Sequence, residues 1–405
     1  MINKNISPFK PKKFSRLKSN FFNIYTFNAG FKKNSNDLLI IVFKKLFKQS
    51  ILSTISSTKA APVIWNNKIK NNLCKVLIVN SGNANAFTGS KGSAQIKAYA
   101  KIASKIFNCN LYEIFVSSTG VIGEQLNSDL IISQLEMIKF AKKKNLYDAA
   151  KSIMTTDTYA KIALKNIIIN KKKIKIYGIA KGSGMIAPNM GTMLSYIFIE
   201  LDLSKIQLRK ILKENISDTF NSISVDGDTS TNDTVMLFSL NDSRKLYLKD
   251  KKSFNLVSLA IKDVMLDLAK QIVCDGEGIS KLIEVKVSNA KSRIQANTIA
   301  FSIAESSLVK TAIYGEDANW GRIIMAIGKT NEKINLKKLV ISIGKNIIVR
   351  NSMEAKNINL TKLASYMKNK IIRINVNMGL GSFNKTVWSS DLTHKYISIN
   401  TDYRS

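Results

Sequence analysis

The stretch IAPNMGTMLSYIF, from Ile186 to Phe198, contains no charge and no histidine, and it places Thr192 directly after Gly191. A threonine that begins a chain carries its own general base, because its free α-amine lies beside its hydroxyl. The ordinary pKa of an α-amine is about 7.7–8.0, close to the pH at which a general base works best. Thr192 could therefore act as a nucleophile if the Gly191–Thr192 bond were cut, and glycine tolerates the strained backbone that this cut requires. A plain strand residue is the alternative interpretation.

Few other residues could supply the base of an acyl-transfer site. The chain has one histidine, His394, in the segment DLTHKY near its C-terminus. A Ser-His-Asp or Cys-His arrangement would have to use that residue. The surrounding pattern is more typical of a strand residue that faces solvent, so we expect the base to be another group.

Three polar segments each leave two interpretations open. NSGNANAFTG (Asn80–Gly89) is either a binding loop or a plain connection after a strand. In SSTGVIG, Thr119 and Gly120 could present a hydroxyl and a backbone N–H to a developing oxyanion, or they could form a turn. MTTDTYAK surrounds Asp157 with threonines, which suits a site and a helix cap equally.

Several features argue against metal and nucleotide sites. GIAKGSGMI lacks the spacing of a phosphate-binding loop, and VDGDTSTNDT lacks the spacing and final glutamate of an EF-hand. The three cysteines, Cys74, Cys109 and Cys274, are widely spaced and odd in number, so neither a zinc cluster nor a disulfide framework is indicated. We therefore predict no metal ligands and a reducing, cytoplasmic location.

Alternating apolar patterns predict a mixed α/β fold. DLLIIVF, KVLIVN, EIFVSSTG, KIKIYGIAKG and TMLSYIFIEL are typical of strands, whereas GSAQIKAYAKIASKIF, NSDLIISQLEMIKFAKK, SKIQLRKILKENI and SFNLVSLAIKDVMLDLAKQIV are typical of helices. CDGEG places Glu277 on a tight turn after the last of these helices. Beyond about Ile283 the strands become shorter, with two helical stretches among them, so we predict a nucleophile-bearing domain over residues 1–283 and a smaller α+β domain over residues 284–405.

The composition fits a globular protein of basic charge. The chain has 405 residues, 45% of them hydrophobic, and a formal net charge of +34. Such a charge could indicate a nucleic-acid partner, but the lysines are spread along the chain together with many isoleucines and asparagines. Because these three residue types share AT-rich codons, compositional drift is the preferred explanation, and we predict no nucleic-acid partner. No apolar run is long enough to span a bilayer, so no membrane partner is expected. The basic N-terminus is no secretory signal, although an organelle-transit peptide remains an alternative.

KGSGMIAPNMGTML resembles the autoprocessing motif of the ornithine acetyltransferase family, also called bifunctional arginine biosynthesis protein or glutamate N-acetyltransferase. Other segments are similar to that family and occur in its order: KAAPV, NSGNANAFTG, SSTGVIGEQL, MTTDTYAK, FNSISVDGDTSTNDTV, SLVKTAIYGEDANWGR and DLTHKYISINTDYRS. Together they cover the chain from about residue 25 to residue 405. Two positions depart from the family, which usually has alanine at position 191 and often has cysteine at position 390. Neither Gly191 nor Ser390 should block the chemistry.

The resemblance implies a fold, a cleavage and a set of site residues. The family fold is an α/β/β/α-type sandwich like that of N-terminal-nucleophile hydrolases, with a smaller α+β domain. The precursor cuts itself between Gly191 and Thr192, which would give an α chain of residues 1–191 and a β chain of residues 192–405. Thr192 would then be the nucleophile. The family's oxyanion pair matches Thr119 and Gly120, and its substrate-contacting positions match Thr155, Lys181, Thr192, Glu277, Asn400 and Ser405.

The implied reaction is acetyl transfer from N2-acetylornithine to glutamate through an acetyl-threonine, which gives ornithine and N-acetylglutamate. By resemblance, Lys181 would hold a substrate α-carboxylate, Glu277 would pair with an amino group of ornithine, and the C-terminal tail would fold back over the site. No cofactor is expected, and acetyl-CoA as a second donor stays open. The usual assembly is an α2β2 heterotetramer. An amide hydrolase or aminopeptidase on the same fold is the alternative enzyme, and a non-enzymatic basic binding protein is a third hypothesis.

Overall fold

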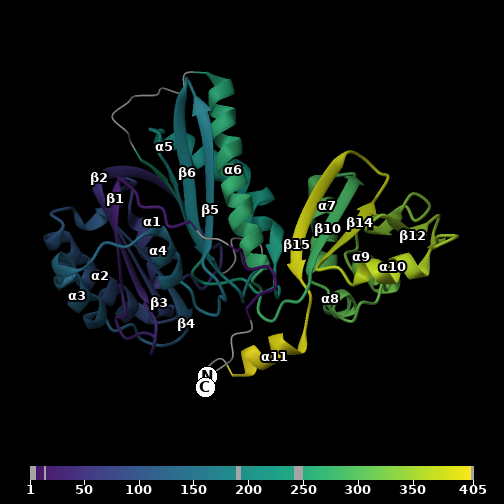
Figure 1. Ribbon diagram of the computed structural model, residues 1–405, viewed down its shortest axis with the longest axis horizontal. Coiled ribbons are helices and arrows are strands. Elements are labelled where there is room, and N and C mark those ends of the chain that lie inside the picture. Colours follow the sequence, from purple (N-terminus) through teal and green to yellow (C-terminus); the bar gives the residue numbers. More distant parts are fainter. Residues whose placement is uncertain (1–5, 13–14, 188–192, 241–249, 403–405) are drawn as a thin grey trace.

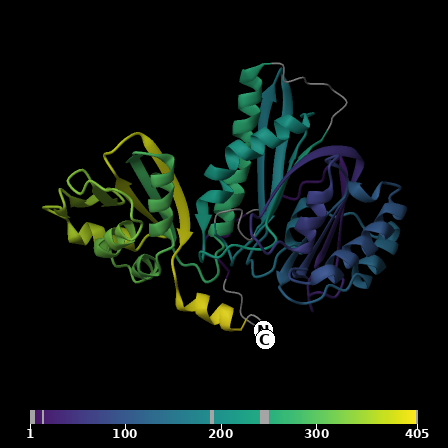
Figure 2. The same ribbon diagram turned by 180° about the vertical axis from the view of Figure 1, so that it is seen from behind.

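The computed structural model describes residues 6–12, 15–187, 193–240 and 250–402. These residues form two lobes, which Figures 1 and 2 show from opposite sides. Each lobe is built around one sheet, with eight strands in the first lobe and seven in the second.

The sheet of the first lobe has the strand order β4-β3-β2-β9-β7-β6-β5, with β1 paired to β2 outside this path. Its strands are β1 (Phe22–Phe27), β2 (Leu38–Ser53), β3 (Leu73–Asn83), β4 (Ile114–Val121), β5 (Lys161–Ile169), β6 (Lys172–Lys181), β7 (Leu194–Ile199) and β9 (Thr234–Ser239). The helices of this part of the chain are α1 (Ala61–Lys68), α2 (Gly89–Ile106), α3 (Asp129–Glu136), α4 (Leu146–Ser152), α5 (Lys205–Asn215) and α6 (Lys251–Val273).

The long strand β2 connects the two halves of this sheet. Its first residues pair with β3, its last residues pair with β9, and the pairing with β3 changes register between Val42 and Phe47. The halves fold over an aromatic core, since the ring of Phe22 on β1 lies 4.8 Å from that of Phe198 on β7, a strand with which β1 does not pair. Both rings are buried, so the halves pack face to face.

Helices cover the outer faces of the two halves. Helices α1 and α2 contact β4, α5 contacts β2 and β9, and α6 contacts β5 and β6. Figure 1 shows the resulting order across the first lobe, with α2 and α3 on one side and α6 on the other. The predicted mixed α/β class is confirmed, and the layers run helix, strand, strand, helix. Within the described ranges no helix is long and apolar enough to cross a bilayer.

The second lobe has the strand order β13-β12-β11-β14-β10-β15-β8. Its strands are β8 (Ile223–Ser224), β10 (Leu282–Ala290), β11 (Val340–Ile343), β12 (Asn346–Arg350), β13 (Met353–Glu354), β14 (Ile371–Asn377) and β15 (Phe383–Ser390). Its helices are α7 (Arg293–Ala304), α8 (Ser307–Tyr314), α9 (Trp320–Gly328), α10 (Leu360–Met367) and α11 (His394–Thr401). Two helical stretches were expected after Ile283, whereas the described residues of this part contain five helices. The expectation was wrong because four of these helices have only eight or nine residues, too few for a clear apolar period. The domain boundary near Ile283 stays a prediction.

Candidate active site

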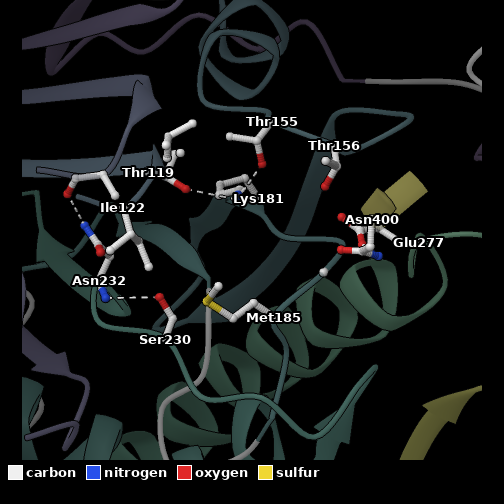
Figure 3. Close-up of a pocket in the computed structure, with 14 residues that line it drawn as sticks. Thr119, Ile122, Thr155, Thr156, Lys181, Met185, Ser230, Asn232, Glu277 and Asn400 are labelled. Atoms are coloured by element: carbon white, nitrogen blue, oxygen red, sulfur yellow. Dashed lines mark hydrogen bonds between the residues drawn. The ribbon is translucent and has the colours of Figure 1, made fainter. Parts of the chain in front are cut away.

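The ends of two strands from different halves of the first sheet meet at one cavity. Thr119 and Gly120 lie at the end of β4, and Lys181 is the last residue of β6. The cavity has a volume of about 270 Å³. Its lining combines residues from the sheet, from loops and from the C-terminal helix: Ala84, Thr119, Gly120, Val121, Ile122, Thr155, Thr156, Lys181, Gly184, Met185, Ser230, Asn232, Glu277 and Asn400 (Figure 3).

Gly120 brings the backbones of β3 and β4 unusually close together at the wall of the cavity. Its φ is +135°, in the region that favours glycine. A Cβ atom at this position would lie 2.2 Å from the carbonyl carbon of Gly82 and 2.5 Å from the backbone nitrogen of Asn83. Gly120 is therefore required by the approach of two main chains, and that approach fixes where its own N–H and the neighbouring Thr119 lie.

Lys181 lies at the centre of a group of hydroxyls. Its side chain is 3% exposed, and its Nζ donates hydrogen bonds to Thr119 Oγ1 at 3.1 Å and to Thr155 Oγ1 at 2.9 Å (Figure 3). Burial lowers the pKa of the Lys181 ammonium below its ordinary value; the nearby carboxylate of Asp157 opposes this shift and the ammonium of Lys161 adds to it. The cavity therefore contains a desolvated cation beside the hydroxyl that the sequence assigns to the oxyanion pair.

A buried ionic network holds the backbone around these groups. Lys161 Nζ lies 2.6 Å from Asp157 Oδ1 and 2.6 Å from Asp275 Oδ2, and all three side chains are inaccessible to solvent. Burial by itself would raise the pKa of Asp157, but the charges of Lys161 and Lys181 keep that pKa well below its usual range. Asp157 also accepts the N–H of Thr155 at 2.9 Å and that of Gly182 at 2.7 Å. The Asp157 carboxylate thus holds the backbone of Gly182, which follows Lys181, and of Thr155, whose hydroxyl accepts a hydrogen bond from Lys181.

On the opposite side of the cavity, an acidic side chain forms a hydrogen bond with the C-terminal helix. Glu277 is 7% exposed and lies in the turn after α6, and Asn400 on α11 donates its Nδ2 hydrogen bond to Glu277 Oε2 at 2.8 Å. Figure 1 shows α11 returning from the second lobe towards the first, and Figure 3 shows Glu277 and Asn400 side by side. Gly184 packs against the Glu277 carboxyl so closely that a Cβ atom there would lie 2.4 Å from its Cδ. The acidic group is therefore held from both sides.

Two aspartates accept hydrogen bonds from backbone N–H groups on either side of the predicted cleavage position. Asp226 accepts the N–H groups of Met185 at 2.6 Å and Ile186 at 2.9 Å. Asp233 accepts the N–H of Met193 at 2.7 Å, and its other carboxyl oxygen is buried without a hydrogen-bond partner among the described residues. Burial raises the pKa of Asp226 to about 6 and raises the pKa of Asp233 well above its usual value.

The structure brings most of the predicted site residues to this one cavity. Those that line it are Thr119, Gly120, Thr155, Lys181, Glu277 and Asn400. Gly191, Thr192 and Ser405 lie outside the described residues. His394 is exposed as expected but begins helix α11, so its assignment to a strand was wrong. The helix-cap interpretation of Asp157 was also wrong, because α4 ends at Ser152 and the Asp157 carboxylate accepts the N–H groups of Thr155 and Gly182.

Sequence reasoning missed the residues that support the site. Lys161, Asp275, Asp226 and Asp233 were not singled out, although each lies within or next to a quoted motif. Burial distinguishes Lys161, Asp233 and Asp275 from other charged residues, and a lysine in a strand gives no sign of burial until its partners are known. Their position beside motif residues was the one available signal.

The assembled groups suit acyl transfer to or from an amine. A hydroxyl and a backbone N–H at the end of β4 can donate to one developing oxyanion. A carboxylate on the opposite side can accept a substrate ammonium group. Among the described residues, no group of three or more histidine, cysteine, aspartate or glutamate side chains is arranged to hold a metal ion.

Known protein sequences match nearly the whole chain. The sequence model of the ArgJ family matches residues 23–405. The arginine biosynthesis bifunctional protein ArgJ of Bartonella henselae is 43% identical over 387 residues, which cover 94% of each chain. The protein of the same name from Zymomonas mobilis is 42% identical over 406 residues, which cover 99% of each chain. Among solved structures, the arginine biosynthesis bifunctional protein argJ of Bacillus halodurans is similar with a TM-score of 0.48 and 36% identity, covering 51% of this chain and 98% of that one. Ornithine acetyltransferase of Mycobacterium tuberculosis complexed with ornithine is similar with a TM-score of 0.36 and 26% identity, covering 43% of this chain and 93% of that one.

Proposed function

The chain belongs to the ArgJ family, and from this membership we propose that it transfers the acetyl group of N2-acetylornithine to glutamate, producing ornithine and N-acetylglutamate for arginine biosynthesis. The observation that carries the proposal is the meeting of Thr119, Gly120, Lys181 and Glu277 at one cavity. These residues come from three separate segments of the chain. The charges of Lys181 and Glu277 match the carboxylate and ammonium groups of an amino-acid substrate, and Thr119 and Gly120 can donate hydrogen bonds to the oxyanion of acyl transfer.

The nucleophile of the proposed reaction is Thr192. The precursor cuts the Gly191–Thr192 bond, and the liberated α-amine of Thr192 takes the proton of its hydroxyl as that hydroxyl attacks the acetyl carbonyl. The oxyanion that forms accepts hydrogen bonds from the Thr119 hydroxyl and the Gly120 N–H. The amine then gives its proton to the leaving nitrogen of ornithine, which leaves an acetyl ester on Thr192.

The second half of the reaction reverses these steps with a different amine. The neutral α-amine of glutamate attacks the acetyl ester, the Thr192 amine takes the excess proton from the attacking nitrogen and returns it to the threonine oxygen, and N-acetylglutamate departs. Glu277 provides a site for the side-chain ammonium of ornithine, while the positive charge of Lys181 makes the cavity favourable for a carboxylate. No cofactor is required, and acetyl-CoA would enter as an alternative acetyl donor to the same threonine.

The two products of cleavage would remain one folded unit. Segments 1–191 and 192–405 share the first sheet, because β6 pairs with β7 and β2 pairs with β9. The buried ion pair of Lys161 with Asp275 also joins the two segments. We propose that two such pairs form an α2β2 heterotetramer. A cytoplasmic location accords with the free thiols of Cys74, Cys109 and Cys274.

The assay that tests this function follows both products of the acetyl group. Purified protein is incubated with N2-acetylornithine, with and without glutamate, and ornithine, N-acetylglutamate and free acetate are quantified. We expect N-acetylglutamate to form in equal amount to ornithine, with little acetate. Release of acetate without N-acetylglutamate would instead identify the hydrolase that is the alternative function, since water would then replace glutamate as the acceptor.

A further inference from the structure

The hydrogen bonds around Lys181 set the direction of two hydroxyl protons. Lys181 Nζ donates to Thr119 Oγ1 and to Thr155 Oγ1, and an ammonium group can only donate. Each threonine oxygen therefore uses an acceptor site for the lysine and keeps its own proton for another acceptor. For Thr119 this leaves the O–H available to donate to an oxyanion, and the charge behind it strengthens that hydrogen bond.

One carboxylate controls the position of both partners in these contacts. Asp157 accepts the N–H of Thr155 through Oδ2 and the N–H of Gly182 through Oδ1. Because Gly182 follows Lys181 directly, these bonds fix the backbone from which the Lys181 side chain extends. Lys161 compensates the buried charge of Asp157 at 2.6 Å, and Asp275 completes the network on its other side.

We propose that Asp157 is a positioning residue for acetyl transfer, which acts through Lys181 and Thr155 to present the Thr119 hydroxyl to the oxyanion. The inference rests on the proposed function, since it concerns how the same oxyanion is stabilised. Lys181 transmits this effect, because its ammonium donates a hydrogen bond to the threonine that contacts the reacting oxygen. Loss of Asp157 should therefore lower kcat more than it raises KM.

The charges that face Lys181 give the proposal a second readout. Asp157, Glu277 and Asp233 favour the charged form of Lys181, whereas Lys161 and burial disfavour it. Neutralising Asp157 should lower the pKa of Lys181 further, while neutralising Lys161 should raise it, because an adjacent charge shifts a pKa by about 1–3 units. If the charged lysine supports the reaction, the alkaline limb of the kcat profile should move to lower pH in one variant and to higher pH in the other.

The test compares Asp157→Asn and Lys161→Met with variants of an exposed ion pair, one member of which shares strand β5 with Lys161. Lys165 on β5 and Asp263 on α6 lie 3.3 Å apart with both side chains about half exposed, so Asp263→Asn and Lys165→Met are matched controls. For Asp157→Asn we expect kcat to fall about 10- to 100-fold, a smaller effect than the roughly 100- to 1,000-fold loss on removing an oxyanion donor. KM for N2-acetylornithine should change less than threefold, which is about 0.7 kcal/mol or less. The alkaline limb should move down by about one pH unit or more. The controls should keep the wild-type profile.

Each outcome of this comparison has a definite meaning. Limbs that move in opposite directions in the two variants support the proposal, and limbs that stay in place, or a change confined to KM, overturn it. Should either variant fail to fold, the pH profile of the wild-type enzyme still tests the proposal. The proposal requires kcat to fall on the alkaline side with a midpoint below about pH 10.5, the ordinary pKa of lysine. A wild-type kcat that stays level up to that pH would overturn it. A wild-type enzyme that releases acetate instead of forming N-acetylglutamate would refute the proposed function rather than this inference.

Discussion

Replacement of Gly120 by alanine tests whether the close approach of β3 and β4 forms the oxyanion site. The new Cβ would lie 2.2 Å from the carbonyl carbon of Gly82, whereas ordinary van der Waals contact begins near 3.4 Å. The strands would therefore have to separate by roughly 1.2 Å at this point, the difference between these two distances. A displacement of about 1 Å in a reacting group can reduce a rate about 100-fold, and we expect a loss in kcat of at least that size.

Gly123 provides the matched control for this substitution. It lies two residues beyond the end of β4 and has a φ of +89°, and a Cβ atom added to it would meet no heavy atom within 4 Å. Gly123→Ala therefore introduces a comparable backbone strain of about 1–2 kcal/mol without the steric clash. We expect its thermal midpoint to fall slightly and its kcat to stay within a few-fold of the wild type.

The assay measures initial rates of N-acetylglutamate formation at saturating N2-acetylornithine, together with thermal midpoints for both variants. Mass spectrometry of each preparation establishes the extent of cleavage, so that rates are expressed per cleaved enzyme. A Gly120→Ala enzyme that is cleaved and transfers acetyl at the wild-type rate would refute the assignment of the Thr119–Gly120 backbone to the oxyanion site.

Three further substitutions test the acidic side of the cavity and a buried lysine of the second lobe. Glu277→Gln keeps the shape of the side chain but removes its charge, so KM for N2-acetylornithine should rise about 10- to 100-fold, as expected for the loss of a hydrogen bond to a charged group of about 1.5–3 kcal/mol. Asn400→Ala should raise KM by a smaller factor. Unchanged KM values in steady-state kinetics would argue against an ammonium site at Glu277. Lys310 donates to the carbonyl of Val225, and burial lowers the pKa of its ammonium to about 8. Because the unfolded chain then holds the extra proton between pH 8 and about 10.5, the contribution of Lys310 to stability should increase as pH rises through this window, by up to about 1.4 kcal/mol per pH unit. Thermal midpoints of wild type and Lys310→Met between pH 7 and pH 10 should show the wild type gaining relative to the variant, and parallel curves would contradict the assignment.

The sequence patterns predicted most elements of the first lobe but not the way its sheet folds. The segment DLLIIVF is a strand as expected, yet β2 continues to Ser53 and changes register within its pairing with β3. Strand β2 joins the two layers by pairing with β3 and with β9, and these two partners are far apart in the sequence. The helix α11 escaped prediction for another reason: none of its residues is buried, so it has no apolar period to detect.

The site was predictable to different degrees. Thr119, Lys181 and Glu277 were selected from motifs of a known family, whereas spacing alone favoured a turn at Thr119 and Gly120. The supporting ion pair could not have been selected from its own segment, because Lys161 and Asp275 are separated by 114 positions. An isolated lysine in a strand is normally exposed, and the partner that permits its burial becomes evident only in the folded chain.

The central claim is that the hydroxyl of Thr192 carries the acetyl group after its own nitrogen has been released. The most direct measurement is mass spectrometry of the purified protein after incubation with N2-acetylornithine in the absence of glutamate. We predict two chains, with the second beginning at Thr192 and carrying one acetyl group on that residue, which glutamate then removes. An uncut chain that still forms N-acetylglutamate, or an acetyl group carried on a different residue, would contradict this mechanism.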